Sequence, residues 1–290
     1  MERRGEAVRE PRGLIAPAWG YYGVFFLAPL LIIVAFAFAH REGFFDITFG
    51  FYPENVAELW DPLYLQIYRD TMLLALGGTV GCLLIGYPFA YWLATRVGRH
   101  KTLLLLLVVV PFWTSILIRT YAWQLILSPQ GPLSSGLQAL DLIGSPLAVL
   151  NTNRAILLGV IYDYLPLMVF PLYVSIERMD RGLVEASRDL GAGRWRTFRR
   201  VTLPLTMPGI LTGCLLVFVP MTGEYVVPTI LGGARQALFG PIVADTFLEA
   251  IDYPFGAAMS LVMVVFLLVV IFLYLRLLGR RAERTLGAAL

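Results

Sequence analysis

Three ionisable residues lie inside long apolar runs of this 290-residue chain, and they are its first candidates for chemistry. Asp163 and Glu224 carry carboxyl groups, and Arg119 carries a guanidinium. A charge at the centre of a membrane costs at least about 2.5–3.5 kcal/mol, so such residues face a protein interior or water. Prolines at 166 and 220 lie close by, and helix-breaking residues beside ionisable ones often mark a transport path. The expected chemistry is the pairing of a buried carboxylate with a passing cation.

Asp163 is the deepest of these groups, about nine residues or ~13 Å past the start of its run. The predicted pathway residues are Asp163, Glu224, Trp113, Arg119 and Tyr164. Two alternatives stand beside this prediction. Asp163 and Arg119 can form a purely structural ion pair, and Glu224, near the end of its run, can lie at the outer interface and meet lipid headgroups.

Six apolar runs must position these residues, and each has roughly the 20 residues that cross about 30 Å of hydrocarbon. The runs are 21–39, 71–93, 102–127, 155–176, 208–227 and 255–278. They are continuously apolar, which indicates helices rather than the alternating strands of a barrel. The chain is 58% hydrophobic and 15% charged, with a mean hydropathy of +0.72, whereas a soluble domain carries about 25% charged residues. We predict an all-α, polytopic membrane protein with six transmembrane helices.

The basic residues predict the orientation. Of the 23 lysines and arginines, eighteen lie in the N-terminal tail, in 94–101, in 177–207 and from residue 276 onward, whereas the alternate loops hold three. Because basic residues accumulate on the cytoplasmic side, both termini and segment 177–207 are predicted to be cytoplasmic. The net charge of +3 is therefore an orientation signal, and the chain has no basic stripe interleaved with aromatics that would indicate nucleic-acid binding. Ala-Phe-Ala at 35–37 resembles a cleavage site, but the long run before it favours an uncleaved first span.

Segment 177–207 has the pattern of a helical hairpin. Asp180 is placed to cap a helix over 181–190, and Gly191 is placed to end it. A second short helix follows, and we expect Pro204 to stop it before the fifth span. A basic amphipathic segment more often lies on a membrane surface than docks on a protein, so amphipathicity alone does not assign its role.

The spacing in this segment resembles the EAA motif of binding-protein-dependent ABC importer permeases. That motif reads Glu-Ala-Ala, three residues, Gly, nine residues, Ile, one residue, Leu-Pro. The matching positions are Glu185, Ala186, Ser187, Gly191, Val201, Leu203 and Pro204. Serine replaces the second alanine and valine replaces isoleucine, and both changes preserve size closely. Six further stretches look like the spermidine/putrescine permease subfamily: 111–115, 117–123, 164–168, 223–228, 231–233 and 254–258.

This resemblance implies a type I ABC importer permease fold. Residues 1–20 would be a cytoplasmic tail and 21–290 the permease domain, with its core at 71–278, its coupling loop at 177–207 and a peripheral first span. The implied partners are two cytoplasmic ATPase subunits, a sister permease in a heterodimer, a periplasmic solute-binding protein and membrane lipid. The implied location is the bacterial inner membrane, with both termini cytoplasmic.

The implied solute is a polyamine such as spermidine or putrescine. One alternative is a permease of the same family for another small organic or inorganic solute. A proton-coupled secondary transporter is a more distant alternative, because such a protein would be expected to show an internal repeat, and the chain shows none.

No motif predicts catalysis by this chain. A G-x-x-x-x-G-K-[ST] loop is absent, and Lys101 is the only lysine, so the residues that cradle a nucleotide phosphate are missing. The two cysteines each lie in an apolar run, and their spacing suggests neither a metal site nor a disulfide. We expect a non-catalytic subunit without a cofactor or metal, with ATP and Mg²⁺ bound by the partner subunits.

Overall fold

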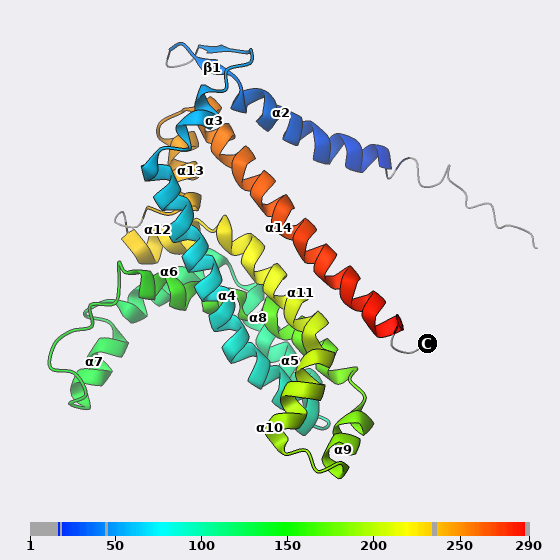
Figure 1. Cartoon of the computed structure of the whole chain (residues 1–290). Coiled ribbons are helices and arrows are strands. Elements are labelled where there is room, and N and C mark those ends of the chain that lie inside the picture. Colours follow the sequence, from blue (N-terminus) through cyan, green and yellow to red (C-terminus); the bar gives the residue numbers. More distant parts are fainter. Residues whose placement is uncertain (1–16, 18, 44–45, 234–236, 288–290) are drawn as a thin grey trace, which may run out of the picture. The chain divides into compact units, whose positions relative to one another are not determined.

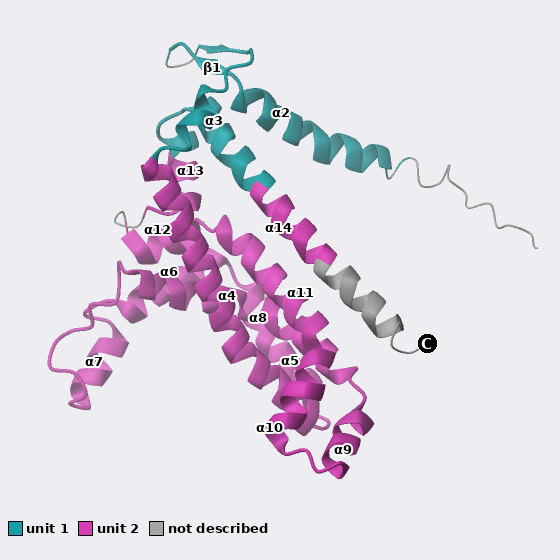
Figure 2. Cartoon of the chain, viewed as in Figure 1, with its two compact units in different colours: residues 1–61, 246–265 teal, residues 62–245, 266–290 magenta. Residues whose placement is uncertain are grey.

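The computed structural model describes residues 17, 19–43, 46–233 and 237–287, with the backbone alone for 277–287. The chain forms two compact units (Figure 2), one of residues 1–61 with 246–265 and one of residues 62–245 with 266–290. Helices dominate both units (Figure 1), which confirms the predicted all-α class. Most of the predicted tail at 1–20 lies outside the described residues.

The smaller unit joins an apolar helix to a two-stranded hairpin. Its elements are η1 (Gly23–Leu27), α2 (Ala28–Ala37), β1 (His40–Arg41), β2 (Ile47–Thr48), α3 (Glu54–Glu58) and the first part of α14 (Tyr253–Gly287). The amide of Asn55 donates to the carbonyl of Ala39 at 2.8 Å and so satisfies a backbone group just past the end of α2. Arg41 lies 3.2 Å from the carboxylate of Asp252, which ties the strand pair to the start of α14.

The larger unit is a bundle centred on three helices that pack pairwise, α4, α8 and α11. Its elements are α4 (Pro62–Arg96), α5 (Lys101–Val109), η2 (Val110–Trp113), α6 (Ile116–Leu127), α7 (Pro132–Ala139), α8 (Asn153–Glu177), α9 (Arg181–Asp189), α10 (Arg194–Thr197), η3 (Phe198–Thr202), α11 (Leu203–Thr222), α12 (Val226–Gly232), most of α13 (Phe239–Leu248) and the last part of α14. Its fully buried side chains include Cys82, Val160, Met168, Leu172 and Val217.

Close contact between α8 and α11 depends on a glycine. A Cβ atom added at Gly209 would lie 2.4 Å from Cβ of Ser175 and 2.6 Å from the carbonyl oxygen of Pro171. The backbones of two membrane helices approach this closely where small residues leave room. Any larger residue at this position would push α8 and α11 apart.

Five described helices are long and apolar enough to cross a membrane: Trp19–Ala37, Pro62–Arg96, Asn153–Glu177, Arg194–Thr222 and Tyr253–Arg276. A bent pair, Lys101–Trp113 with Ile116–Ala139, meets at 92° and makes a sixth span when it is counted as one. The predicted third span at 102–127 is therefore interrupted. The interruption falls at Thr114 and Ser115, whose backbones are extended and separate η2 from α6.

The predicted stop at Pro204 is wrong. The helix that begins at Arg194 continues to Thr222. Residues 198–202 form the π-helical turn η3, and Pro204 occupies the first turn of α11 directly after it. Proline disrupts an α-helix by removing one backbone donor. Beside a π-helical turn the hydrogen-bond pattern is already shifted, so the helix accommodates it.

The predicted run at 208–227 is also shifted: it begins and ends five residues after α11, which spans Leu203–Thr222. Helix α11 ends at Thr222, and Gly223 follows as its C-terminal cap. Conversely, Pro166 and Pro171 lie inside α8 without breaking it. Each proline removes a single backbone donor, and the packing of α4 and α11 along α8 retains the helix. Glu224 is thereby placed in the break between α11 and α12, and Asp163 in an unbroken helix.

Candidate functional site

Local signals build the hairpin formed by α9 and α10. The carboxylate of Asp180 accepts a hydrogen bond from the backbone N–H of Gly182 at 2.8 Å, which caps α9 as predicted. Gly191 has φ of +81°, a left-handed conformation that disfavours residues with a Cβ atom. The chain reverses there and α10 begins at Arg194. The predicted cap and the predicted end of the first hairpin helix are both confirmed.

Side-chain contacts hold the hairpin rigid. The hydroxyls of Ser187 and Thr197 lie 3.1 Å apart and join α9 to the buried end of α10. The ring of Trp195 stacks on Phe198 at 5.6 Å between centroids. The guanidinium of Arg181 donates to the carbonyl oxygen of Ala94 at 2.9 Å and ties the hairpin to the end of α4. The role of Arg181 was not predicted, because its partner lies 87 residues away.

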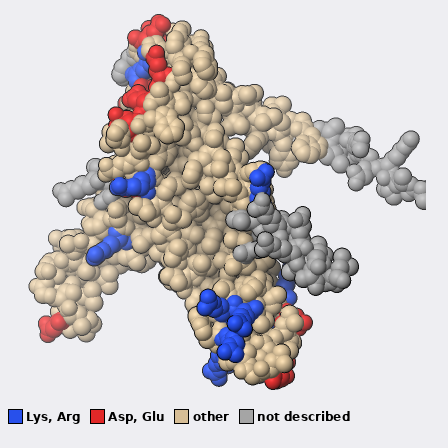
Figure 3. Space-filling model, in the orientation of Figure 1, with Lys and Arg blue, Asp and Glu red and all other residues tan. Residues whose placement is uncertain are grey.

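The outward face of the hairpin is uncovered in the described part of the chain. Leu190 is 89% exposed and Trp195 is 72% exposed, and Glu185 is exposed on the same hairpin. Large exposed apolar side chains beside charges mark protein interaction surfaces. Lys and Arg side chains gather over this end of the larger unit (Figure 3).

The structure divides the EAA-like residues into two groups. Glu185, Ala186, Ser187 and Gly191 lie on the projecting hairpin. Val201, Leu203 and Pro204 lie where η3 runs into α11, at the root of the hairpin. The motif therefore specifies both a projecting element and its rigid connection to a long helix.

Four of the five predicted pathway residues meet in the larger unit, and we call Arg119, Asp163, Tyr164 and Glu224 the polar cluster. Arg119 Nε lies 3.1 Å from Asp163 Oδ1, and their side chains are 11% and 5% exposed. Nη1 of Arg119 also donates to the carbonyl oxygen of Pro111 at 2.7 Å. The structure thus contains the Arg119–Asp163 ion pair that the sequence offered as an alternative to a role in the solute path.

Glu224 closes the other side of the polar cluster. Its Oε2 accepts a hydrogen bond from the hydroxyl of Tyr164 at 2.5 Å. Its Oε1 accepts from the backbone N–H groups of Val226 at 2.9 Å and Val227 at 3.3 Å. A carboxylate at this position caps the N-terminus of α12 and neutralises its exposed donors. Neither contact was predicted from the sequence.

Trp113, the fifth predicted pathway residue, lies apart from the polar cluster. It ends η2, and its side chain is 81% exposed. The residue therefore belongs to the surface beside the break in the third span. No described group of three His, Cys, Asp or Glu residues lies close enough together to hold a metal ion.

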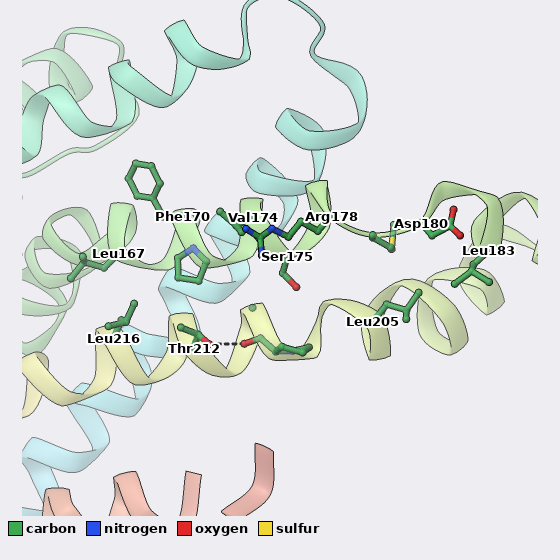
Figure 4. A pocket seen from close by; sticks show the side chains of 14 residues that line it. Leu167, Phe170, Val174, Ser175, Arg178, Asp180, Leu183, Leu205, Thr212 and Leu216 are labelled. Atoms are coloured by element: carbon green, nitrogen blue, oxygen red, sulfur yellow. Dashed lines mark hydrogen bonds between the residues drawn. The ribbon is translucent and has the colours of Figure 1, made fainter. Parts of the chain in front are cut away.

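A groove of about 680 Å³ runs between α8 and α11 toward the hairpin. Leu167 and Leu216 face each other near one end, and Asp180 and Leu183 lie at the other (Figure 4). Asp180 is the one acidic residue among the described residues of its lining, and it already caps α9. The groove is mostly apolar and shares no lining residue with the polar cluster.

Comparisons with known proteins test the family that the hairpin residues predict. The family described as "binding-protein-dependent transport system inner membrane component" matches residues 86–284. The chain is 42% identical over 262 residues to the spermidine/putrescine transport system permease protein PotB of Haemophilus influenzae, covering 89% of this chain and 92% of that protein. It is 40% identical over 273 residues to PotB of Escherichia coli, covering 93% and 99%.

A solved structure shares the fold. A bacterial ABC transporter involved in the import of the acidic polysaccharide alginate superposes with a TM-score of 0.68 at 17% identity, over 93% of this chain and 94% of that chain. The family inferred from the spacing of the hairpin residues is thus confirmed, as is the type I ABC importer permease fold. The chain belongs to the family of binding-protein-dependent transport system inner membrane components.

Proposed function

We propose that this chain carries a polyamine across the membrane as one permease subunit of an ATP-binding-cassette importer. The observation that carries this proposal is the 42% identity, over 89% of the chain, to a relative named as a spermidine/putrescine permease. The polar cluster adds chemical support, because polyamines are small organic cations and the cluster holds two carboxylates. The fold alone does not select the solute, since the alginate importer shares it.

The proposed assembly places the hairpin in the cytoplasm on two ATPase subunits, with a sister permease beside this chain and a periplasmic solute-binding protein outside. Eighteen basic residues on the hairpin side of the predicted topology support this orientation. The external loops would carry ten acidic residues against three basic ones, which would favour a cation at the entrance. Basic residues are depleted outside for topological reasons as well, so the orientation is the stronger of the two inferences.

Coupling to ATP hydrolysis would use the hairpin as a lever. Leu190, Trp195 and Glu185 would contact the ATPase through their exposed side chains. The hairpin connects to α8 through the short link 178–180, continues into α11 through η3 and is hydrogen-bonded to α4 through Arg181. Packed elements move as units rather than deforming continuously. Movement of the hairpin would thus reach the three central helices at once.

The solute path would pass the polar cluster. A primary ammonium group carries three donors and pairs well with a buried carboxylate. Asp163 would make this contact, whereas Glu224 is already occupied by three donors within the fold. Tyr164 would then act by fixing Glu224 and the start of α12.

The test is spermidine uptake into proteoliposomes that contain the complete complex, with the solute-binding protein added outside. Asp163→Asn should lower uptake by about tenfold or more, since a charge-assisted contact is worth roughly 1.5–3 kcal/mol. Complex yield and basal ATP hydrolysis should persist. The matched control is Asp141→Asn, an exposed acidic residue outside the long helices, which should leave uptake unchanged.

Three outcomes separate the possibilities. Normal spermidine uptake by Asp163→Asn would remove Asp163 from the path. A complex that transports another solute but not spermidine would overturn the polyamine assignment while leaving the permease assignment intact. ATP hydrolysis by the isolated chain would contradict its role as a non-catalytic subunit.

A further inference from the structure

The two carboxylates of the polar cluster differ in how their oxygens are used. Both oxygens of Glu224 accept hydrogen bonds, from Tyr164 and from two backbone N–H groups. Asp163 is 5% exposed, yet its Oδ1 accepts no hydrogen bond from the described residues. Buried polar atoms are nearly always satisfied, and an exception calls for an explanation. An ammonium ligand would supply the missing donor.

Arg119 approaches Asp163 without filling that role. Nε of Arg119 lies 3.1 Å from Oδ1, but it too has no hydrogen-bond partner among the described residues. The two atoms are close enough to attract as charges, whereas the N–H does not point at the oxygen. A structural arginine–carboxylate pair is normally aligned and often bidentate, so this pair is a loose one.

The guanidinium of Arg119 has its own support on the opposite side. Nη1 donates to the carbonyl oxygen of Pro111 at 2.7 Å. The guanidinium carbon lies 5.6 Å from the centre of the Phe112 ring, within the range of a cation–π contact. Both supports come from η2, before the break in the third span. Arg119 therefore keeps two contacts when Asp163 turns toward another cation.

We propose that Arg119 is the resident counter-cation of Asp163, and that an ammonium group of the solute takes its place during passage. This inference rests on the proposed function. Arg119 neutralises the buried carboxylate while no solute is present, which avoids the large cost of an unpaired charge. When the ammonium arrives, the arginine stays nearby on Pro111 and Phe112 and repels it. Binding is then weak enough for the solute to leave, as conduction through a pore requires.

The experiment measures spermidine binding and uptake by the assembled complex with four variants: Arg119→Gln, Arg119→Lys, Asp163→Asn and the double variant Arg119→Gln/Asp163→Asn. Equilibrium binding is measured on the purified complex without the solute-binding protein. Arg119→Gln should bind spermidine roughly tenfold more tightly, since a like charge within a few ångströms is removed. Its uptake should fall because release is slower. Arg119→Lys retains the charge and should bind spermidine with an affinity close to that of the unaltered complex.

The double variant separates this inference from a purely structural ion pair. It removes both charges, so the complex should assemble, but it should neither bind spermidine in the bundle nor transport it. Recovery of normal uptake in the double variant would show that the pair is structural and overturn the inference. If Arg119→Gln does not assemble, the double variant alone decides between the two. Loss of uptake in Asp163→Asn combined with unchanged binding in Arg119→Gln would refute the counter-cation role while sparing the proposed path. Normal uptake in Asp163→Asn would instead refute the path itself.

Discussion

The contacts within the hairpin and those within the polar cluster differ in the sequence separation of the residues that they join. In the hairpin, Asp180 accepts a hydrogen bond from Gly182, two positions later in the sequence. Ser187 contacts Thr197, ten positions later. In the polar cluster, Tyr164 meets Glu224 across 60 positions, and Arg119 joins α6 to α8. The cap and turn of the hairpin therefore form within its own segment, and Arg181 then ties the hairpin to α4 across 87 positions. The polar cluster, in contrast, exists only once several helices have packed.

This difference predicts different consequences of substitution. The hairpin projects its Leu190 and Trp195 side chains outward, so a changed hairpin can leave the bundle intact while failing to engage a partner. The polar cluster lies among α6, α8 and the break after α11, with Asp163 buried and its three other members half-buried. A change there can lower the stability of the bundle as well as alter a solute contact. Uptake divided by complex yield separates the two cases.

The largest expected effect is that of Gly191→Val in the hairpin. Gly191 has φ of +81° and open space around a would-be Cβ. A β-branched residue in this conformation costs about 1–3 kcal/mol through the backbone alone. We expect the turn to shift, and spermidine uptake to fall about tenfold or more at normal complex yield. The measurement is uptake together with solute-stimulated ATP hydrolysis in proteoliposomes.

Gly193 provides the matched control for this prediction. It also has open space around a would-be Cβ, but its φ is −64°. Gly193→Val therefore adds the same side chain without backbone strain and should retain most uptake. Equal losses in the two variants would show that bulk on the hairpin surface, rather than the turn, determines coupling.

The same difference in range explains what the sequence could predict. The cap at Asp180 and the turn at Gly191 follow from the chemistry of a few adjacent residues, and both predictions are confirmed. The Arg119–Asp163 pair could be stated only as one of two alternatives, because residue types do not determine which helix faces which. The contact between Tyr164 and Glu224 was not predicted for the same reason.

Errors in the predicted spans have a second cause. The sequence predicts a stop at Pro204 and a helix-breaking residue at Pro166. Pro204 follows a π-helical turn and Pro166 lies in a closely packed helix, and neither one breaks its helix. The break that does occur in the third span falls at Thr114 and Ser115, a few residues after Pro111. Packing and local hydrogen bonding, rather than the presence of proline, decide where these helices end.

A medium effect is expected for Glu224→Gln in the polar cluster. Glutamine keeps the size of the side chain but lacks the negative charge to which two backbone N–H groups of α12 donate hydrogen bonds. Loss of a charged N-terminal cap costs about 1–2 kcal/mol. The thermal midpoint and the yield of the complex should fall, and uptake per assembled complex should stay nearly normal. A loss of uptake at unchanged yield would place Glu224 in the solute path and weaken its contrast with Asp163.

A smaller effect is expected for Tyr164→Phe. The substitution removes the hydroxyl that donates to Glu224 and leaves the ring in place. Because Glu224 Oε1 retains two backbone donors, the carboxylate remains partly satisfied. We expect a loss of about 1 kcal/mol in stability, measured as a lower thermal midpoint. The double variant Tyr164→Phe/Glu224→Gln should lose less than the sum of the single losses, because the two residues share one contact.

The smallest expected effect is that of Ser187→Ala, which introduces the alanine typical of the EAA motif. Removal of the serine hydroxyl leaves the buried Thr197 without the partner that it has across the hairpin. One neutral hydrogen bond contributes about 0.5–1.5 kcal/mol, and the stacked pair of Trp195 and Phe198 still holds α10 in place. Uptake should therefore fall by less than about threefold, with complex yield unchanged. The companion variant Thr197→Val, combined with Ser187→Ala, replaces both hydroxyls by apolar groups and should restore uptake. If Ser187→Ala alone lowers uptake as strongly as Gly191→Val, the hydroxyl pair rather than the glycine turn sets the angle of the hairpin.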